Sequence, residues 1–196
     1  MEGIGKEQLL TSKSGKWKVT YNAPLTLTFT FISLGFVVFN YITAGWINQA
    51  FALYPNFSLL DSYRFFTYIF CHADWSHLAA NSIYLLMLGP LLEEKYGAKE
   101  LLFMTGCTAL VTGLLNNLLF QNVIVGASGI VFMFIVLSSL VNMKRKEIPL
   151  TFILVSIVFI GNEVVNSFTA DNISQFGHIC GGLCGGAFGF MKRNLT

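Results

Sequence analysis

The sequence contains little charge. Asp, Glu, Lys and Arg make up 11% of its 196 residues, whereas they make up about 25% of a typical soluble domain. Hydrophobic residues account for 54%, and the mean hydropathy is +0.63. This composition lies outside that of soluble domains and predicts an integral membrane protein.

Basic runs, paired cysteines and metal-ligand patterns are also scarce. The net charge is +2 and the longest basic run is 144–146, which leaves nucleic acid without an electrostatic attachment site. The four cysteines, Cys71, Cys107, Cys180 and Cys184, lie mostly in apolar segments and lack C-x-x-C spacing, which argues against a disulfide framework and a zinc site. The histidines lack the H-E-x-x-H pattern, so we expect no metal ion. Because the basic residues are few and scattered, we also expect no nucleic-acid partner.

Long apolar segments cover most of the chain and are near the length that spans a bilayer. The predicted spans are 24–46, 77–92, 101–120, 128–141, 148–165 and 174–191. All are expected to be helices, because a chain in lipid must satisfy its own backbone hydrogen bonds. The predicted fold is all-α, a polytopic bundle of six transmembrane helices. Residues 1–23 are expected to form a short cytoplasmic arm, and residues 24–196 a single membrane domain.

The distribution of Lys and Arg predicts the orientation. Eleven of the twelve lie in the arm, in the second and fourth connections, or in the tail, and the odd-numbered connections hold only Arg64. The positive-inside rule therefore places both termini in the cytoplasm. The first outer connection, about 47–76, is long and half apolar, and we expect it to lie partly in the membrane interface.

Three polar residues from three predicted spans fall at one depth. Ser128 lies 16 residues before Lys144, or about 24 Å at 1.5 Å per residue, which is less than the roughly 30 Å of hydrocarbon. His178 lies at a similar height above the inner end of its span, as does His77. A histidine at membrane depth is costly and normally indicates a functional site. The alternative is that these residues only form hydrogen bonds between helices.

Glycines at 181, 185 and 189 recur every four residues and form a smooth stripe on which another helix can pack closely. His178 shares the face of this stripe, because it lies three residues before Gly181. If the span that begins at Ser128 is the neighbour, the two side chains can form a hydrogen bond. The imidazole can then act as general base on the hydroxyl.

The motif HLAAN places His77 and Asn81 four residues apart, on one face of a helix near its outer end. Side-chain donors that converge on one point suit an oxyanion hole. Interfacial anchoring is the alternative reading of this pair. His72 precedes His77 by five residues and shares no helix face with it, so we interpret His72 as an interface residue.

Together GASG, HLAAN, GHICGGLCGG and YRFFTYIFCHADWSH, with six predicted helices, make the chain resemble the rhomboid intramembrane serine proteases. The resemblance covers about 24–193. It implies that Ser128 is the nucleophile, that His178 is the general base, and that His77 and Asn81 stabilise the oxyanion. Gly126 matches the glycine that keeps the substrate-binding loop open above the serine.

The resemblance also implies an activity and a location. Such proteases cleave transmembrane segments of other proteins, near their outer end and after a small residue, and use no cofactor or metal. The expected partners are therefore transmembrane substrates and the lipid bilayer, and the expected location is the plasma (inner) membrane of a bacterium. The chain resembles the minimal six-helix form. It departs from the family pattern at Gly177, where alanine is usual, and at Tyr63, where tryptophan is typical.

Two other functions remain open from the sequence. A catalytically inert relative would bind membrane clients without cutting them, but such proteins typically lose the serine or the histidine. A small transporter or channel would need paired broken helices in both halves or an acidic ring for ions, and the sequence shows neither. We interpret Glu163 as an interfacial residue and Asp171 as a solvated loop carboxylate.

Overall fold

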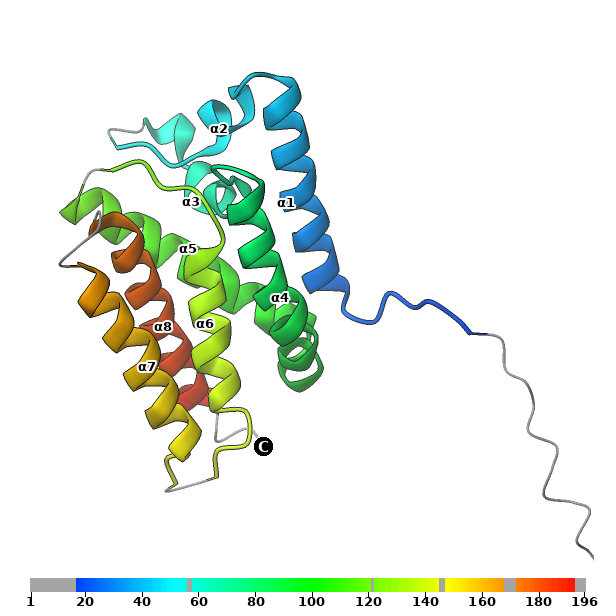
Figure 1. The fold of residues 1–196 in the computed structure, drawn as a ribbon, viewed down its shortest axis with the longest axis vertical. Helices are drawn as coiled ribbons and strands as arrows, with labels where there is room; N and C mark the ends of the chain where they lie inside the picture. Colours follow the sequence, from blue (N-terminus) through cyan, green and yellow to red (C-terminus); the bar gives the residue numbers. More distant parts are fainter. Residues whose placement is uncertain (1–16, 56–57, 121, 145–146, 168–171, 193–196) are drawn as a thin grey trace, which may run out of the picture.

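The computed structural model describes residues 17–55, 58–120, 122–144, 147–167 and 172–192, without the side chains of residues 160, 162–167 and 172–174. The side chain of Glu163, the whole of Asp171 and residues 1–16 of the expected arm therefore lie outside the described part of the chain. The elements are α1 (Pro24–Ile42), α2 (Trp46–Phe51), η1 (Leu59–Asp61), α3 (Arg64–Thr67), η2 (Tyr68–Phe70), α4 (Trp75–Tyr96), α5 (Ala98–Leu119), α6 (Ser128–Ser139), α7 (Leu150–Ser167) and α8 (Asn172–Lys192) (Figure 1).

The protein is helical, and a long helix is present at each of the six segments that the sequence marks as apolar. Between α1 and α4 the chain forms four shorter helical pieces, which the sequence did not predict. Within the described residues the β-type pairing is one isolated bridge between Leu53 and Ile124. Figure 1 shows that α1 begins and α8 ends at the same end of the bundle.

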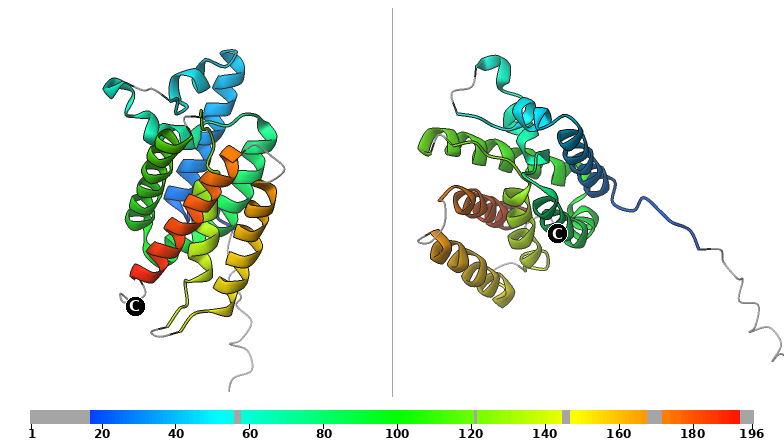
Figure 2. Two further views of the ribbon diagram at one scale, coloured as in Figure 1. Left: turned by 90° about the vertical axis from the view of Figure 1, so that its left-hand side faces the viewer. Right: turned by 45° about the horizontal axis from the view of Figure 1, so that its top comes forward.

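Helix α6 lies at the centre of the bundle, with α4, α5, α7 and α8 around it (Figure 2). Its buried residues face every direction around the helix, from Ile130 and Val131 to Val136 and Leu137. A helix that is apolar all round must be surrounded by other helices. This explains why the sequence from Ile130 to Leu137 is apolar almost without interruption.

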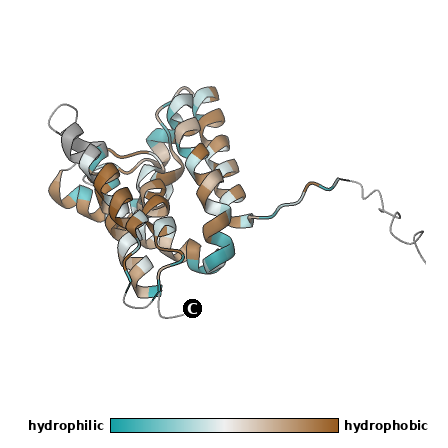
Figure 3. Ribbon diagram, turned by 60° about the horizontal axis from the view of Figure 1, so that its bottom comes forward, coloured by the Kyte–Doolittle hydropathy of each residue, from teal (hydrophilic) through white to brown (hydrophobic). Residues whose placement is uncertain are grey.

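Large apolar side chains are exposed along the outer helices, as on α1 at Phe31 and Phe39 and on α5 at Leu102 and Phe103. Figure 3 shows that hydrophobic residues occur along most of each helix. Among the described residues, α1 and α5 are long and apolar enough, by length and composition, to cross a membrane, and the shorter helices Ser128–Ser139 and Leu150–Phe159 are also apolar. These surfaces are consistent with insertion into lipid.

The first connection folds around Arg64. Its Nη1 donates to the carbonyl oxygens of Gln49 at 2.8 Å and Ala52 at 2.9 Å, and its Nε pairs with Asp61 at 3.2 Å. The Tyr63 hydroxyl donates to the carbonyl of Ala50 at 2.8 Å. The Tyr63-Arg64 pair therefore ties the end of α2 to η1 and α3 within the connection.

At the opposite end of the bundle, the N-terminus of α1 is capped by a carboxylate from α4. Residue 23, which precedes the helix, provides no side-chain cap. Glu93 is buried, and its carboxylate accepts hydrogen bonds from the backbone N–H of Leu25 at 2.9 Å, from that of Thr26 at 3.0 Å and from the Thr26 hydroxyl at 2.9 Å. A carboxylate here satisfies donors that a helix start otherwise leaves unpaired and interacts favourably with the helix dipole.

Replacing Glu93 by glutamine should destabilise the protein by about 1 to 3 kcal/mol, because an amide N–H would then face donors that need an acceptor. Thermal unfolding in detergent, followed by circular dichroism, measures the effect. The neighbouring Glu94 is exposed, so Glu94→Gln is the matched control and should leave unfolding unchanged. Equal unfolding midpoints for the two variants would show that the cap contributes nothing.

Candidate active site

The start of α6 places Ser128 at the end of a tight backbone turn. Gly126 has φ +110°, a conformation that side-chain-bearing residues rarely adopt, and its N–H donates to the carbonyl of Tyr68 at 3.0 Å. Ala127 is fully buried, and Ser128 is the first residue of the helix. The turn therefore holds the serine at the N-terminus of a helix, where backbone N–H groups have no intrahelical partner.

The glycine stripe of α8 packs against the backbone of α6. A Cβ atom on Gly181 would collide with the carbonyl oxygen of Gly129, and one on Gly185 would lie 2.5 Å from the carbonyl oxygen of Met133. Helix α6 is thus the neighbour that the stripe accommodates. Because His178 lies one turn before Gly181 and Ser128 immediately precedes Gly129, this contact brings the two side chains together.

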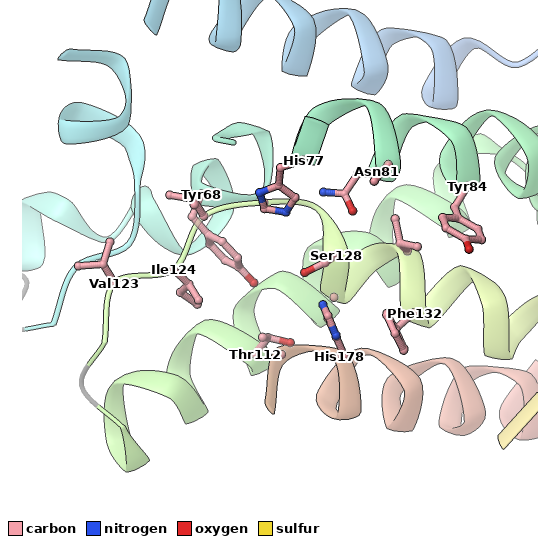
Figure 4. Close-up of a pocket in the computed structure, with 16 residues that line it drawn as sticks. Tyr68, His77, Asn81, Tyr84, Thr112, Val123, Ile124, Ser128, Phe132 and His178 are labelled. Atoms are coloured by element: carbon pink, nitrogen blue, oxygen red, sulfur yellow. The ribbon is translucent and has the colours of Figure 1, made fainter. Parts of the chain in front are cut away.

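All five residues that the sequence singled out line one pocket of about 430 Å³: Ser128, His178, His77, Asn81 and Gly126. In Figure 4 the Ser128 hydroxyl and the His178 ring point toward one another, and His77 and Asn81 approach from α4. Tyr68 and Thr112 line the same pocket. The site is therefore assembled from α4, α6, α8 and the connection before α6.

The His77 and Asn81 side chains converge on the turn before Ser128. A Cβ built on Gly126 would lie 2.8 Å from Nε2 of His77 and 3.7 Å from Nδ2 of Asn81. The Asn81 amide nitrogen is buried and has no hydrogen-bond partner among the described residues. An unpaired buried donor is costly unless a ligand satisfies it. This arrangement can stabilise negative charge on an oxygen beside the serine.

The His178 ring stacks on Phe132, with centroids 4.2 Å apart and planes 4° from parallel. Phe132 in turn packs edge-on against Phe159 of α7. Sequence reasoning missed Phe132, although a signal existed: it lies four residues after Ser128 and so on the same face of α6. The stacking therefore holds the plane of the imidazole.

His72 is buried inside the protein, which the sequence did not predict. The residue is 1% exposed, and its ring lies 5.0 Å from the ring of His77 in an edge-to-face arrangement. The sequence interpretation considered helix faces alone, whereas His72 lies outside α4, in the connection that precedes the helix. Burial lowers the pKa of His72 to about 4, so the ring is neutral at pH 7.

This pKa predicts a pH dependence of stability. The unfolded state binds a proton on His72 below pH of about 6.5, whereas the folded state does not until about pH 4. The contribution of the neutral His72 ring to folding stability is therefore complete above pH of about 6.5 and is lost as the pH falls toward 4. Between pH 7 and pH 4, the free energy of unfolding should fall more steeply for wild type than for His72→Phe. Parallel curves would contradict the prediction.

No group of three or more His, Cys, Asp or Glu side chains in the described part of the chain is arranged to hold a metal ion.

Comparison with known proteins decides the family. The Rhomboid domain model matches residues 60–195, which include the whole pocket. The chain belongs to the rhomboid family.

Rhomboid relatives match along much of the chain. It is 30% identical over 192 residues to rhomboid protease GluP of Bacillus subtilis (90% of this chain, 36% of the relative), and 40% identical over 98 residues to the chloroplastic rhomboid-like protein 11 of Arabidopsis thaliana (47% and 33%). It is 22% identical over 147 residues to rhomboid protease GlpG of Haemophilus influenzae (72% and 77%). The chain spans about a third of the length of the first two relatives.

The departure from the rhomboid pattern at Gly177 has a simple structural reading. A Cβ on Gly177 would meet Cγ2 of Thr112 at 3.8 Å, an ordinary van der Waals distance. An alanine would therefore fit, and the glycine is not required by a close backbone contact. Its effect is to leave the pocket wall one methyl group wider beside His178.

Replacing Gly126 by alanine should impair this rhomboid site. The new methyl group would lie 2.7 Å from Cε1 of His77, and the backbone would be held at a strained positive φ. We expect the catalytic rate on a transmembrane substrate to fall on the order of 10-fold or more as His77 is displaced. Gly161→Ala provides the control, because a Cβ built at Gly161 would meet no described atom within 4 Å. A full rate in Gly126→Ala would show that the His77 position does not matter.

Proposed function

We propose that this rhomboid protein is an intramembrane serine protease that hydrolyses peptide bonds in or near transmembrane segments of other membrane proteins. One observation carries the proposal: the Ser128 hydroxyl and the His178 ring face one another in a pocket that His77 and Asn81 also enter. A nucleophile, a base and converging donors around one point are the parts that acyl transfer requires.

In the proposed reaction, Ser128 Oγ attacks the substrate carbonyl carbon while the His178 imidazole accepts the hydroxyl proton. The oxyanion that forms is stabilised by Asn81, by His77 and by the backbone N–H of Ser128 at the helix start. The imidazolium then protonates the leaving amine, and an acyl-enzyme remains. Water, deprotonated by the same imidazole, attacks the acyl group and releases the second product.

The dyad needs no acidic third member, because packing supplies the orientation that a carboxylate provides in other serine proteases. The stacking on Phe132 sets the ring plane, and the close backbone contact of Gly181 with Gly129 sets the ring position. No cofactor is needed for this chemistry.

The substrate is expected to be a transmembrane segment that unwinds locally, because the carbonyl groups of an intact helix are hydrogen-bonded within it. Segments with glycine, proline or other weak helix formers near the cleaved bond should therefore be preferred. The proposal includes six membrane-spanning helices, α1, α4, α5, α6, α7 and α8, with both termini in the cytoplasm of a bacterium and the site opening to the outer face of the plasma membrane. The Lys and Arg distribution supports this orientation.

The test uses a fluorophosphonate probe and a single-span substrate. We expect the probe to label purified wild-type protein in detergent and not Ser128→Ala, and mass mapping to find cleavage of the substrate near its outer end. A folded wild-type protein that is neither labelled nor active would contradict the proposal and would favour an inert client-binding role instead.

A further inference from the structure

His72 is a buried imidazole that the proposed reaction does not use. Its Nδ1 lies 3.1 Å from the carbonyl oxygen of Phe70, and its own carbonyl accepts a hydrogen bond from Nδ2 of Asn48 at 2.9 Å. The Phe70 ring packs against Phe29 and Phe36 of α1. The ring of His72 is thus anchored through Nδ1, and its backbone through the carbonyl oxygen, in both cases by groups outside the pocket.

The hydrogen bond to Phe70 determines the tautomer of His72. A carbonyl oxygen only accepts, so Nδ1 of His72 must carry the proton. In the neutral ring Nε2 is then an unprotonated acceptor, and this atom is buried with no hydrogen-bond partner among the described residues. An unpaired buried acceptor is costly, and a polar group retained at such a position calls for a role.

The ring of His72 lies against His77. The centroids are 5.0 Å apart and the planes are inclined by 71°. The backbone N–H of His77 donates to Asp74 at 2.8 Å, but its side chain makes no hydrogen bond to a described group. The His77 ring therefore lies between the His72 ring on one part of its surface and the backbone of Gly126 on another.

We infer that His72 is a positioning residue for His77. Its rigid, neutral ring holds the His77 imidazole in the orientation that presents Nε2 to the oxyanion beside Ser128. The inference rests on the proposed function for the role of His77 in turnover. The contact between the two rings stands independently of that function.

The inference predicts that loss of the His72 ring lowers the turnover rate but leaves KM nearly unchanged. Removing the His72 ring leaves space into which His77 can turn, so His72→Ala should lower kcat on the order of 10- to 100-fold while KM changes little. His72→Phe keeps a flat ring of similar size and should recover part of kcat. If His72 only stabilised the fold, His72→Ala and His72→Phe would have the same kcat once each value is corrected for the fraction of folded protein.

The decisive measurement is a double-mutant cycle with His77→Ala. We expect His72→Ala to lower kcat in the wild-type background and to have no further effect when His77 is already alanine. Equal losses in both backgrounds would overturn the inference. Cys71→Ala removes the adjacent, fully buried side chain and is the control, since its effects should be independent of His77. If His72→Ala does not fold, the same cycle with His72→Phe decides.

A second readout separates this inference from the proposed function. The ¹⁵N chemical shifts of the His77 ring report its tautomer and surroundings without any turnover. We expect them to change in His72→Ala and much less in His72→Phe or Cys71→Ala, even if the protein cleaves nothing. Unchanged shifts in His72→Ala would overturn the positioning role, whereas absent cleavage with changed shifts would contradict the protease proposal alone.

Discussion

Alanine at Ser128, alanine at His178 and the double substitution should all lower kcat by the same factor, on the order of 10⁴ to 10⁶. The two side chains act in one step, because the hydroxyl is a poor nucleophile until the imidazole accepts its proton. Once either is lost, the other has nothing left to contribute. The double variant should therefore be no slower than the worse single variant.

The oxyanion donors remain in all three variants, so the residual rate should still exceed that of the uncatalysed reaction. Cleavage of a single-span substrate, followed over days with quantified product masses, measures the three rates. Phe132→Leu is an instructive companion, since it removes the stacking on His178 at 4.2 Å but neither reacting group. Losses that multiply in the double variant would mean that Ser128 and His178 act separately, which would contradict the dyad.

The positions of the six long helices were predictable from sequence because each depends on a local property. The apolar stretch sets the length, and Pro24, Asp74 and Gly97 mark ends: Pro24 begins α1, Asp74 caps α4, and Gly97, at φ +82°, separates α4 from α5. The membrane orientation of these helices is still a prediction, as is the division into an arm and one domain.

The sequence also predicted that four pocket residues lie together, because the glycine spacing and the depth of the histidines can both be read from it. These residues are Ser128, His178, His77 and Asn81. The four short helical pieces between α1 and α4 were not predictable. They depend on Arg64 reaching the carbonyl oxygens of residues 49 and 52, contacts that no periodicity encodes. The burial of His72 was not predictable for the same reason, since it arises within the same irregular connection. The catalytic roles of the pocket residues remain a proposal.

Glycine at 181 sets the distance between the serine and histidine helices, so Gly181→Ala should damage both stability and activity. Its methyl group would collide with the carbonyl oxygen of Gly129, the residue after Ser128. The obstacle is backbone, which cannot rotate away, so α6 and α8 must separate. We expect a loss of about 2 to 3 kcal/mol in stability. A displacement near 1 Å at the site should also cost about 100-fold in kcat.

Gly182 provides a matched control one residue along the same helix. A Cβ there would lie 3.6 Å from Cγ2 of Val136, which is an ordinary contact. Gly182→Ala should therefore keep full activity and gain roughly 0.5 to 1 kcal/mol from the better helix propensity of alanine. SDS titration of folded protein in mild detergent measures the stabilities, and substrate cleavage measures the rates. If the two variants behave alike, the close approach of α6 and α8 at Gly181 is not what brings His178 to Ser128.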